Sequence, residues 1–465
     1  MKFQSYFDAE MRALQQLNSE NPDHDPSADR ILEGVAYLAA QIHQRLDHDF
    51  PEIPAILLQQ HWPYMLQPYA SRTTLEFSSP TKIMLPQHTL VSSGPAGEEK
   101  TRCTFSVLQE LIIYPIELIK VDINATQLKF CFEAKQANFN LTSLKLYLNT
   151  DINTALEIYY AVGQNNAVNT QAESSAQLWL DYFGFREGFL FIALNNLENI
   201  NLADRFFEVT VALKYLLPPE LELNKNNFKI NCVPAVNLYT YQAEPILYQS
   251  HRADYALIPD NHYPASIVLH SIKNISADYQ WDYARNRLII QDKNIHHNTA
   301  ISCEIMVSNG YYPCQYLNPG MINIMANKNN LITIKNITRP TPYLLPLDHK
   351  DYVWELINCL NINLKKLELP KVLKLFNWSD KSIFKNHIAS IISLTHRPIH
   401  KISQGAFCHG TEFILALKEE GFRNTAEIYL FGCVLHKYFE LISEQNYVIK
   451  TQLELYPSSR ILLWE

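Results

Sequence analysis

Glycine is scarce in this chain, with 12 residues among 465. Loops that bind phosphate groups need glycine, because a residue without a side chain lets the backbone N–H groups approach the ligand closely. The sequence contains no GxxxxGK(S/T), strand-borne GxGxxG, GxSxG or HExxH pattern. These absences argue against the common nucleotide-binding proteins, hydrolases and metalloproteases.

Other absences limit the compartment and the partners. No stretch reaches the ~20 apolar residues that a membrane-spanning helix needs, and the amphipathic start "MKFQSYFDAEMRALQQL" lacks the features of a signal peptide. The eight cysteines are scattered without a CxxC pair, which favours reduced thiols. The net charge of −8 does not favour nucleic acid or an anionic membrane as the main partner. We expect a soluble, cytoplasmic protein without direct membrane insertion.

The chain has instead a large apolar content, 47% of its residues. Residues 1–70 show helical spacing, and a second helix there carries an apolar stripe formed by Ile31, Val35, Leu38, Ile42 and Leu46. From 71 to 336 the period changes to two, as in "FEVTVALKY" (207–215), which indicates β-strands. Within this region we interpret 170–177 as an exposed loop.

The predicted fold class is a multi-domain α+β protein with sandwich-like β modules in the middle. A polar run with paired prolines near 216–227 divides the β-rich region, and "ITRPTPYLLPL" (337–347) predicts an extended connector. Beyond it we expect a strand at 411–417 and a long final helix over 428–442. The predicted domains are 1–70 (helical), 71–220 (first β module), 221–336 (second β module) and 337–465 (connector and mixed α/β domain).

The second helix also holds candidate chemistry. His43 and Asp47 are four residues apart and share one helix face, so they could serve a metal-dependent hydrolase. Two ligands fall short of the three or four that a zinc site needs. With Ala36 and Ala40 they form a strip of small and polar residues beside the apolar stripe. We favour packing of this strip against another helix, either the chain's own or a partner's.

The other reactive side chains favour structural roles. His296 and His297 lie in a polar turn, where solvation is expected. Cys408 and His409 could suggest a thiolate–imidazole pair, but adjacent residues of a strand point to opposite faces. We therefore predict no catalytic, cofactor-binding or metal-binding residue, and the residues alone support a structural or binding protein.

Several stretches resemble the motifs of a known family, and they follow one another along the chain in the same order as in that family. The N-terminal ones are "YFDAEMRAL" and residues 25–68, which contain "LEG" (32–34), "IHQRLD" (42–47), "FPE" (50–52) and "YMLQP" (64–68). The later ones are "LDYFGFREGFLFIAL" (180–194), "NCVPAVNLYTYQAEPI" (231–246), "NGYYP" (309–313), "ITRPTPYLLP" (337–346) and "YLFGCVLHKYFELIS" (429–443).

Together these stretches resemble the TssF family, also called VasA or ImpG, a baseplate subunit of the bacterial type VI secretion system. Two positions depart from the family pattern. Arg186 stands where proline is usual, and "SEQNYVIKTQLEL" (443–455) replaces a more standard Asn-Ser-Phe step. The chain is also shorter than typical members, so a compact or atypical subtype is expected.

The resemblance implies a wedge protein without enzymatic activity or cofactor. Two copies are expected to join one TssG-like subunit, together with TssK-like and TssE-like subunits, around the VgrG spike, and the contractile sheath would assemble on this platform. The assembly would lie in the cytoplasm, docked at the inner face of the cytoplasmic membrane. Apolar faces of the terminal helices would pack on partners, which adds Phe431, Leu435 and Phe439 to Ala36, Ala40, His43 and Asp47 as candidate packing residues.

The same resemblance assigns roles to the other parts. The β modules would act as arms, and the connector at 337–347 would set the angle between arms and helices. A host-targeted effector or a surface adhesin is the remaining alternative. The missing signal peptide and the scattered cysteines argue against the adhesin.

Overall fold

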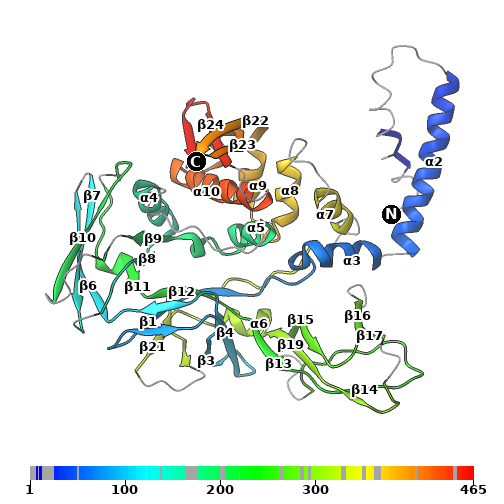
Figure 1. Cartoon of the computed structure of the whole chain (residues 1–465), viewed down its shortest axis with the longest axis horizontal. Coiled ribbons are helices and arrows are strands. Elements are labelled where there is room, and N and C mark those ends of the chain that lie inside the picture. The colour runs from blue at the N-terminus through cyan, green and yellow to red at the C-terminus, as the bar shows by residue number, and fades with distance from the viewer. Residues whose placement is uncertain are drawn as a thin grey trace.

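The structure of the chain is a computed structural model. It describes residues 7–8, 10–12, 26–49, 52–124, 126–136, 139–163, 175–195, 197–198, 205–218, 220–261, 267–282, 287–291, 295–325, 331–347, 352–360, 368–403, 406–443 and 448–464. The fold is α+β, as predicted. Figure 1 shows helix α2 standing apart at one side, a group of helices in the upper part and β-sheets in the lower part. None of the described helices is both long and apolar enough to span a membrane.

Two helices lead into the body of the protein. Helix α2 (Pro26–Asp49) is followed by α3 (Glu52–His61), and the 3-10 turn η1 (Pro63–Met65) ends this segment. Leu58 of α3 is fully buried, and Trp62 packs edge-on against Phe376 with ring centroids 5.6 Å apart. Helix α3 therefore forms the root from which α2 projects (Figure 1).

The centre of the lower part is an antiparallel six-stranded sheet. Its strands, in spatial order, are β20 (Ile322–Met325), β3 (Leu90–Ala96), β4 (Thr101–Val107), β12 (Cys232–Val236), β1 (Arg72–Ser78) and β21 (Thr333–Asn336). Leu75, Phe105, Val233 and Ile322 belong to one core cluster on this sheet. The predicted domain limits stay a prediction, but strands from both sides of the 216–227 break form this one sheet.

Two three-stranded sheets and two short strands complete the first β-rich region. One sheet has the order β10 (Phe206–Ala212), β7 (Gln127–Ala134), β6 (Ile116–Asn124), and the other has the order β11 (Phe228–Ile230), β8 (Leu144–Leu148), β9 (Phe191–Leu194). Strands β2 (Ile83–Leu85) and β5 (Leu111–Ile113) pair with each other. The inner face of the first sheet stacks Phe132 on Phe207, because apolar residues alternate with polar ones along both strands.

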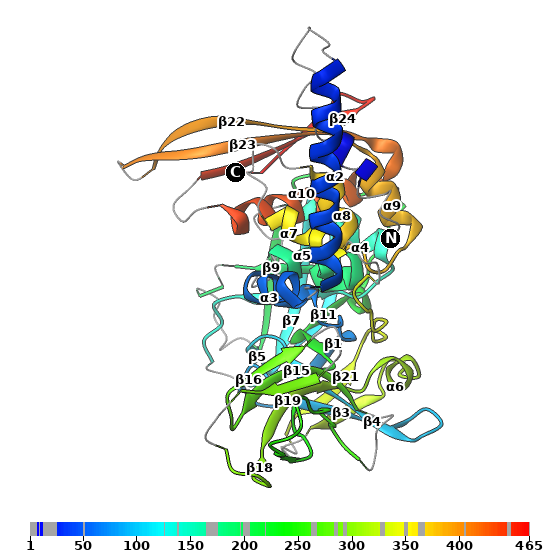
Figure 2. The ribbon, with the colours of Figure 1, turned by 90° about the vertical axis from the view of Figure 1, so that its right-hand side faces the viewer.

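A second β-rich part lies below and beside the six-stranded sheet (Figures 1 and 2). Its three-stranded sheet has the order β13 (Tyr239–Gln242), β19 (Cys303–Ser308), β15 (Val268–Ile275), and it has its own apolar core. The remaining elements are the pairs β14 (Ile246–Leu247) with β18 (Ala300–Ile301) and β16 (Tyr279–Asp282) with β17 (Arg287–Ile290), the 3-10 turn η3 (Lys225–Asn227) and helix α6 (Tyr311–Gln315).

Asn237 and Asn309 join the two β-rich parts. The Asn237 side chain donates to the Thr104 carbonyl oxygen at 2.7 Å and accepts from the Asn309 N–H at 2.7 Å. The Asn309 side chain in turn accepts from the Thr104 N–H at 2.9 Å. Both asparagines are almost fully buried, and buried amides that find several partners hold the elements they connect in one arrangement.

The upper part combines helices with a mixed sheet. Its helices are α4 (Ile152–Val162), α5 (Ser175–Gly184), α7 (Tyr352–Leu360), α8 (Leu369–Phe376), α9 (Ser382–Ala389) and α10 (Thr425–Ile442), with the 3-10 turns η2 (Arg186–Phe189) and η5 (Glu419–Gly421). The sheet order is β22 (Ile391–Ser403), β23 (Ala406–Lys418), β24 (Val448–Tyr456), β25 (Ile461–Trp464). Figure 2 shows the hairpin of β22 and β23 extending beyond the body.

Several local predictions can be compared with these elements. The predicted strand at 411–417 and final helix at 428–442 are confirmed by β23 and α10. The predicted exposed loop at 170–177 is wrong for its described part, because Ser175 and Ala176 begin helix α5 and are buried. Helices α4 and α5 lie inside the stretch that the period-two pattern assigned to strands. Their apolar residues cover the central helix α10, so they follow tertiary packing rather than a strand pattern.

Gly432 in α10 illustrates how tightly the last strand docks. A Cβ atom at this position would lie 2.2 Å from the Trp464 ring, and the Trp464 indole N–H donates to the Cys433 sulfur at 3.3 Å. By contrast, a Cβ atom at Gly34 of α2 would meet nothing within 4 Å.

We predict that Gly432→Ala lowers the free energy of unfolding by about 1–3 kcal/mol, because the added methyl group forces Trp464 out of its site. Gly34→Ala should leave stability unchanged or raise it by up to ~1 kcal/mol, since it adds helix propensity without a clash. Urea unfolding followed by tryptophan fluorescence measures both variants. Equal stability of the two variants would contradict the docking described.

Candidate assembly surface on helix α2

Helix α2 exposes the apolar residues that the sequence pattern placed on one face. The α2 stripe, defined as Ile31, Val35, Leu38 and Ile42, has exposed fractions of 68, 47, 59 and 58%. Leu46, the fifth residue of the predicted stripe, has a side chain outside the described part of the structure. An amphipathic helix normally buries such a face against its own protein, so these side chains form an apolar surface without a cover among the described residues.

The strip of small and polar residues that we predicted to pack against another helix differs from the α2 stripe in its exposure. Ala36 and Ala40 are fully buried, so the face that carries them is already covered within the chain. The side chains of His43 and Asp47 lie outside the described residues, so their predicted role stays a prediction. The surface available on this helix is therefore the apolar stripe rather than the strip of small residues.

The C-terminal packing candidates are not available to a partner in this structure. Phe431, Leu435 and Phe439 are fully buried in the chain's own core. Phe439 stacks on Phe413 with ring centroids 3.9 Å apart, and Phe431 packs against Trp179 at 5.7 Å. Helical spacing identifies an apolar face but not what covers it, and here the sheet and α5 cover it.

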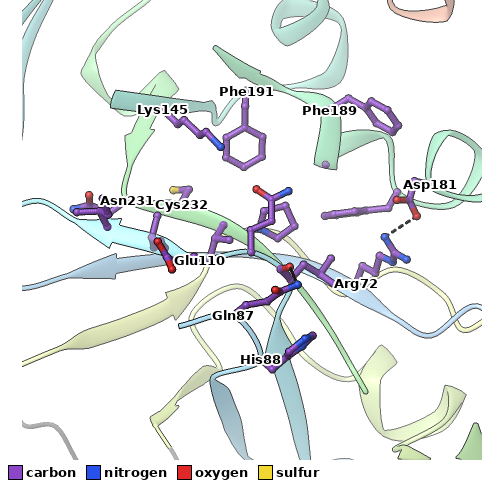
Figure 3. Close-up of a pocket in the computed structure, with 18 of the residues that line it drawn as sticks. Arg72, Gln87, His88, Glu110, Lys145, Asp181, Phe189, Phe191, Asn231 and Cys232 are labelled. Carbon is purple, nitrogen blue, oxygen red and sulfur yellow. Dashed lines mark hydrogen bonds and ion pairs between the residues drawn. The ribbon is translucent and has the colours of Figure 1, made fainter. Parts of the chain in front are cut away.

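An ion pair fixes the point where the N-terminal helices enter the body. The Arg72 guanidinium of β1 lies 2.6 Å from Asp181 of α5, and the Tyr69 hydroxyl donates to the same carboxylate at 3.0 Å. Figure 3 shows this pair at the edge of a cavity between β-strands and helices. Burial raises the pKa of Asp181 even though Arg72 acts in the opposite direction. Such a pair specifies geometry more than it adds stability, because desolvation offsets its attraction.

The proline-rich connector runs along the same point. Tyr69 and Leu344 exchange two backbone hydrogen bonds of 2.8 and 3.0 Å, and the Thr341 N–H donates to the Arg72 carbonyl oxygen at 2.8 Å. The Thr73 hydroxyl donates to the Thr338 carbonyl oxygen at 2.9 Å. Residues 337–347 are thus held against the start of β1.

A second buried charge network lies at the first turn of α10. Glu427 is 2.8 Å from the Arg186 guanidinium and 3.4 Å from His387 Nε2, and it accepts from the Arg423 N–H at 2.9 Å. Burial alone would raise the pKa of Glu427, but His387, Arg186 and that N–H together lower it to about 2. Burial lowers the pKa of His387 and outweighs the carboxylate. We infer that neutral His387 accepts from the Tyr182 hydroxyl through Nδ1, at 3.1 Å.

The remaining sequence candidates lie apart from both networks. His296 and His297 are exposed in a turn, as predicted. His409 pairs across the hairpin with His400, with the two Nδ1 atoms 3.1 Å apart, whereas the Cys408 side chain lies outside the described residues. Within the described ranges, no group of three or more His, Cys, Asp or Glu residues is arranged to hold a metal ion.

Sequence reasoning missed the buried charges Arg72, Asp181, Arg186, His387 and Glu427. For Arg186 the sequence did contain an indication, because this arginine stands where the family pattern usually has proline. Its partner Glu427 is 241 positions away in the chain, so no spacing pattern could connect the two.

Comparisons with known proteins all find relatives in one secretion system, and together they cover most of the chain. A family model described as "Type VI secretion system, TssF" matches residues 11–165, 168–290 and 287–465. A 105-residue segment is 27% identical to the type VI secretion system component TssF1 of Pseudomonas aeruginosa; it makes up 21% of this chain and 17% of that protein.

Two solved structures share the fold. A chain of a TssK-TssF-TssG baseplate subcomplex is 20% identical with a TM-score of 0.78, over 94% of this chain and 98% of that chain. A chain of a type VI secretion system baseplate complex is 19% identical with a TM-score of 0.61, over 100% and 98%. At such identity the likeness concerns the fold.

We predict that stability falls as the pH is lowered from 7 to 5. Burial lowers the pKa of His387 and lowers that of His270 to about 4, so the unfolded chain takes up protons that the folded chain does not. Each such histidine contributes up to about 1.4 kcal/mol per pH unit. Below about pH 4.5 the unfolded chain also protonates Glu427, while the folded chain keeps it ionised down to about pH 2, so further stability is lost. Thermal unfolding midpoints across this range measure the slope.

His387→Gln should reduce the slope between pH 7 and 5, because it removes one of these groups. His296→Gln, in an exposed turn, is the matched control and should keep the wild-type slope. The same slope in all three proteins would show that His387 is not held neutral by burial.

Proposed function

This chain belongs to the TssF family of the type VI secretion system, and we propose that it is a structural wedge subunit of the baseplate, without enzymatic activity. Support comes from the family match, from relatives whose names refer to this system, and from the fold shared with chains of baseplate complexes. A metal-dependent hydrolase using His43 and Asp47 has no supporting observation among the described residues.

The exposed α2 stripe is the observation that carries this proposal. A subunit that is complete in itself would bury such a face, whereas a subunit of a larger assembly keeps it for a partner. Burying each of these side chains contributes about 1.5–3 kcal/mol, so a partner helix across the whole stripe would form a strong contact. Helix α3 leads from α2 into the body, and the chain after α3 is held there by the Arg72–Asp181 ion pair and Tyr69.

The partners we propose are those of the family. A TssG-like subunit would cover the α2 stripes of two copies of this chain, and TssK-like and TssE-like subunits would complete the wedge. Wedges would surround a VgrG spike and support the sheath, in the cytoplasm at the inner face of the cytoplasmic membrane. One structure with the same fold belongs to a TssK-TssF-TssG baseplate subcomplex, which supports the TssG-like and TssK-like partners.

The proposed mechanism is mechanical. The β-rich parts would act as arms toward neighbouring wedges, and residues 337–347 would set the angle between arms and helices. The hydrogen bonds from this connector to Tyr69, Arg72 and Thr73 support that role, since a change of angle would have to break them. The sheath would store the energy, and the wedge would transmit a change of packing.

We predict that Leu38→Asp with Ile42→Asp abolishes assembly with the TssG-like partner, because two carboxylates would be buried in an apolar contact. Affinity should fall at least about a hundredfold. Co-expression followed by affinity purification and size-exclusion chromatography measures complex formation. The unfolding midpoint of the isolated variant should match the wild type, because both side chains are exposed.

Leu216→Asp with Leu247→Asp is the matched control, since these leucines are 74 and 58% exposed elsewhere on the surface. This variant should form the complex normally. If the α2 variant assembles as well as this control, the stripe is not the assembly surface.

A further inference from the structure

Two cavities adjoin between the six-stranded sheet and the sheet of β11, β8 and β9. The larger has a volume of about 600 Å³ and is the one in Figure 3, and the smaller has a volume of about 360 Å³. Tyr114 and Asn231 line both cavities. The Asn231 side chain donates to the Tyr114 carbonyl oxygen at 2.9 Å and accepts from its N–H at 3.0 Å, so a rigid contact marks the boundary. We call the two cavities together the seam groove.

The charged residues of the seam groove fall into paired and unpaired sets. Three pairs lie in its walls, namely Arg72 with Asp181, Lys135 with Glu117, and Lys335 with Glu76. The charged lining residues without an ion pair among the described residues are Lys145, Glu110, Lys225 and Lys229. Lys225 and Lys229 line the smaller cavity, whereas Lys145 and Glu110 line the larger one, so the excess of unpaired positive charge lies at the smaller cavity, on a chain of net charge −8.

The surroundings of Lys145 leave its ammonium group without compensation. Burial lowers the pKa of Lys145, and no acidic residue counteracts it. In Figure 3, Lys145 extends into the larger cavity beside Phe191. A partly desolvated amine of this kind is stabilised when a carboxylate enters.

We propose that the seam groove binds an acidic, extended segment of a partner protein. Carboxylates of that segment would pair with Lys225 and Lys229 in the smaller cavity and with Lys145 in the larger one. The walls of the larger cavity include Phe185, Phe189 and Phe191, which suit an apolar side chain between the acidic ones. Nucleic acid fits less well, because its binding depends mainly on neutralising many phosphates along a strand, and the groove offers three unpaired lysines.

This inference is independent of the proposed assembly through α2, because the groove lies on other elements. It adds a second, electrostatic docking site to the protein. A charge-based site also implies an association that weakens as salt rises.

The test uses the full chain and a fluorescein-labelled peptide of eight glutamates as the probe, measured by fluorescence anisotropy. The wild type should bind the peptide, and binding should weaken as NaCl rises from about 50 to 300 mM. Lys225→Glu with Lys229→Glu should weaken binding about tenfold or more, because two attractive contacts become repulsive. Lys145→Glu should also weaken it.

Lys374→Glu with Lys418→Glu is the matched control. Both lysines are exposed in the upper part, neither has an ion pair among the described residues, and the change in net charge is identical. This control should bind the peptide within about twofold of the wild type. The variant Leu38→Asp with Ile42→Asp should also bind normally, so failure of the groove and failure of the α2 surface are distinguishable.

Two results would overturn the proposal. One is equal peptide affinity of the wild type and the Lys225→Glu, Lys229→Glu variant, when circular dichroism shows that both are folded. The other is a preference for a single-stranded DNA octamer over the glutamate peptide, since this would assign the groove to nucleic acid.

Discussion

The ion pair between Arg72 and Asp181 is the contact on which the arrangement of the other parts depends. Three segments far apart in the sequence meet at it: the exit from α3, helix α5, and the connector at 337–347. Tyr69 donates to the same carboxylate, so this one cluster fixes the point at which the segment after α3 enters the body. A buried ion pair contributes little net stability, and its value lies in defining a single geometry. For the proposed role in assembly, a fixed geometry at this point would be the functional requirement.

The structure separates two kinds of apolar surface that look alike in the sequence. Phe431, Leu435 and Phe439 of α10 repeat with the same helical spacing as Ile31, Val35, Leu38 and Ile42 of α2. The first set is fully buried, because α5 and the sheet of β22 to β25 surround α10. The second set is exposed, because α2 projects from the body (Figure 1). The same pattern therefore forms a core in one place and, in the other, an exposed surface that we propose for assembly.

Charged groups divide in a similar way between structural and binding roles. Glu427 pairs with Arg186, lies close to His387 and accepts from a backbone N–H, and it ties α10 to η2 and α9. Lys145, Lys225 and Lys229 have no such partner among the described residues, and they face open cavities. Buried charges with partners fix the fold, whereas charges left without partners beside a cavity are available to a ligand.

The sequence by itself determined the fold class, the strand of β23, the helix α10 and the apolar stripe of α2, because these depend on local periodicity. The ordered motifs from 25–68 to 429–443 also carried the family. Only the tertiary structure decided which apolar faces are covered, that α4 and α5 are helices within the β-rich stretch, and that strands from both predicted modules share one sheet. It also decided the pairing of Arg72 with Asp181 and of Arg186 with Glu427. Such contacts join residues more than a hundred positions apart, and no local pattern encodes which distant segment will meet another.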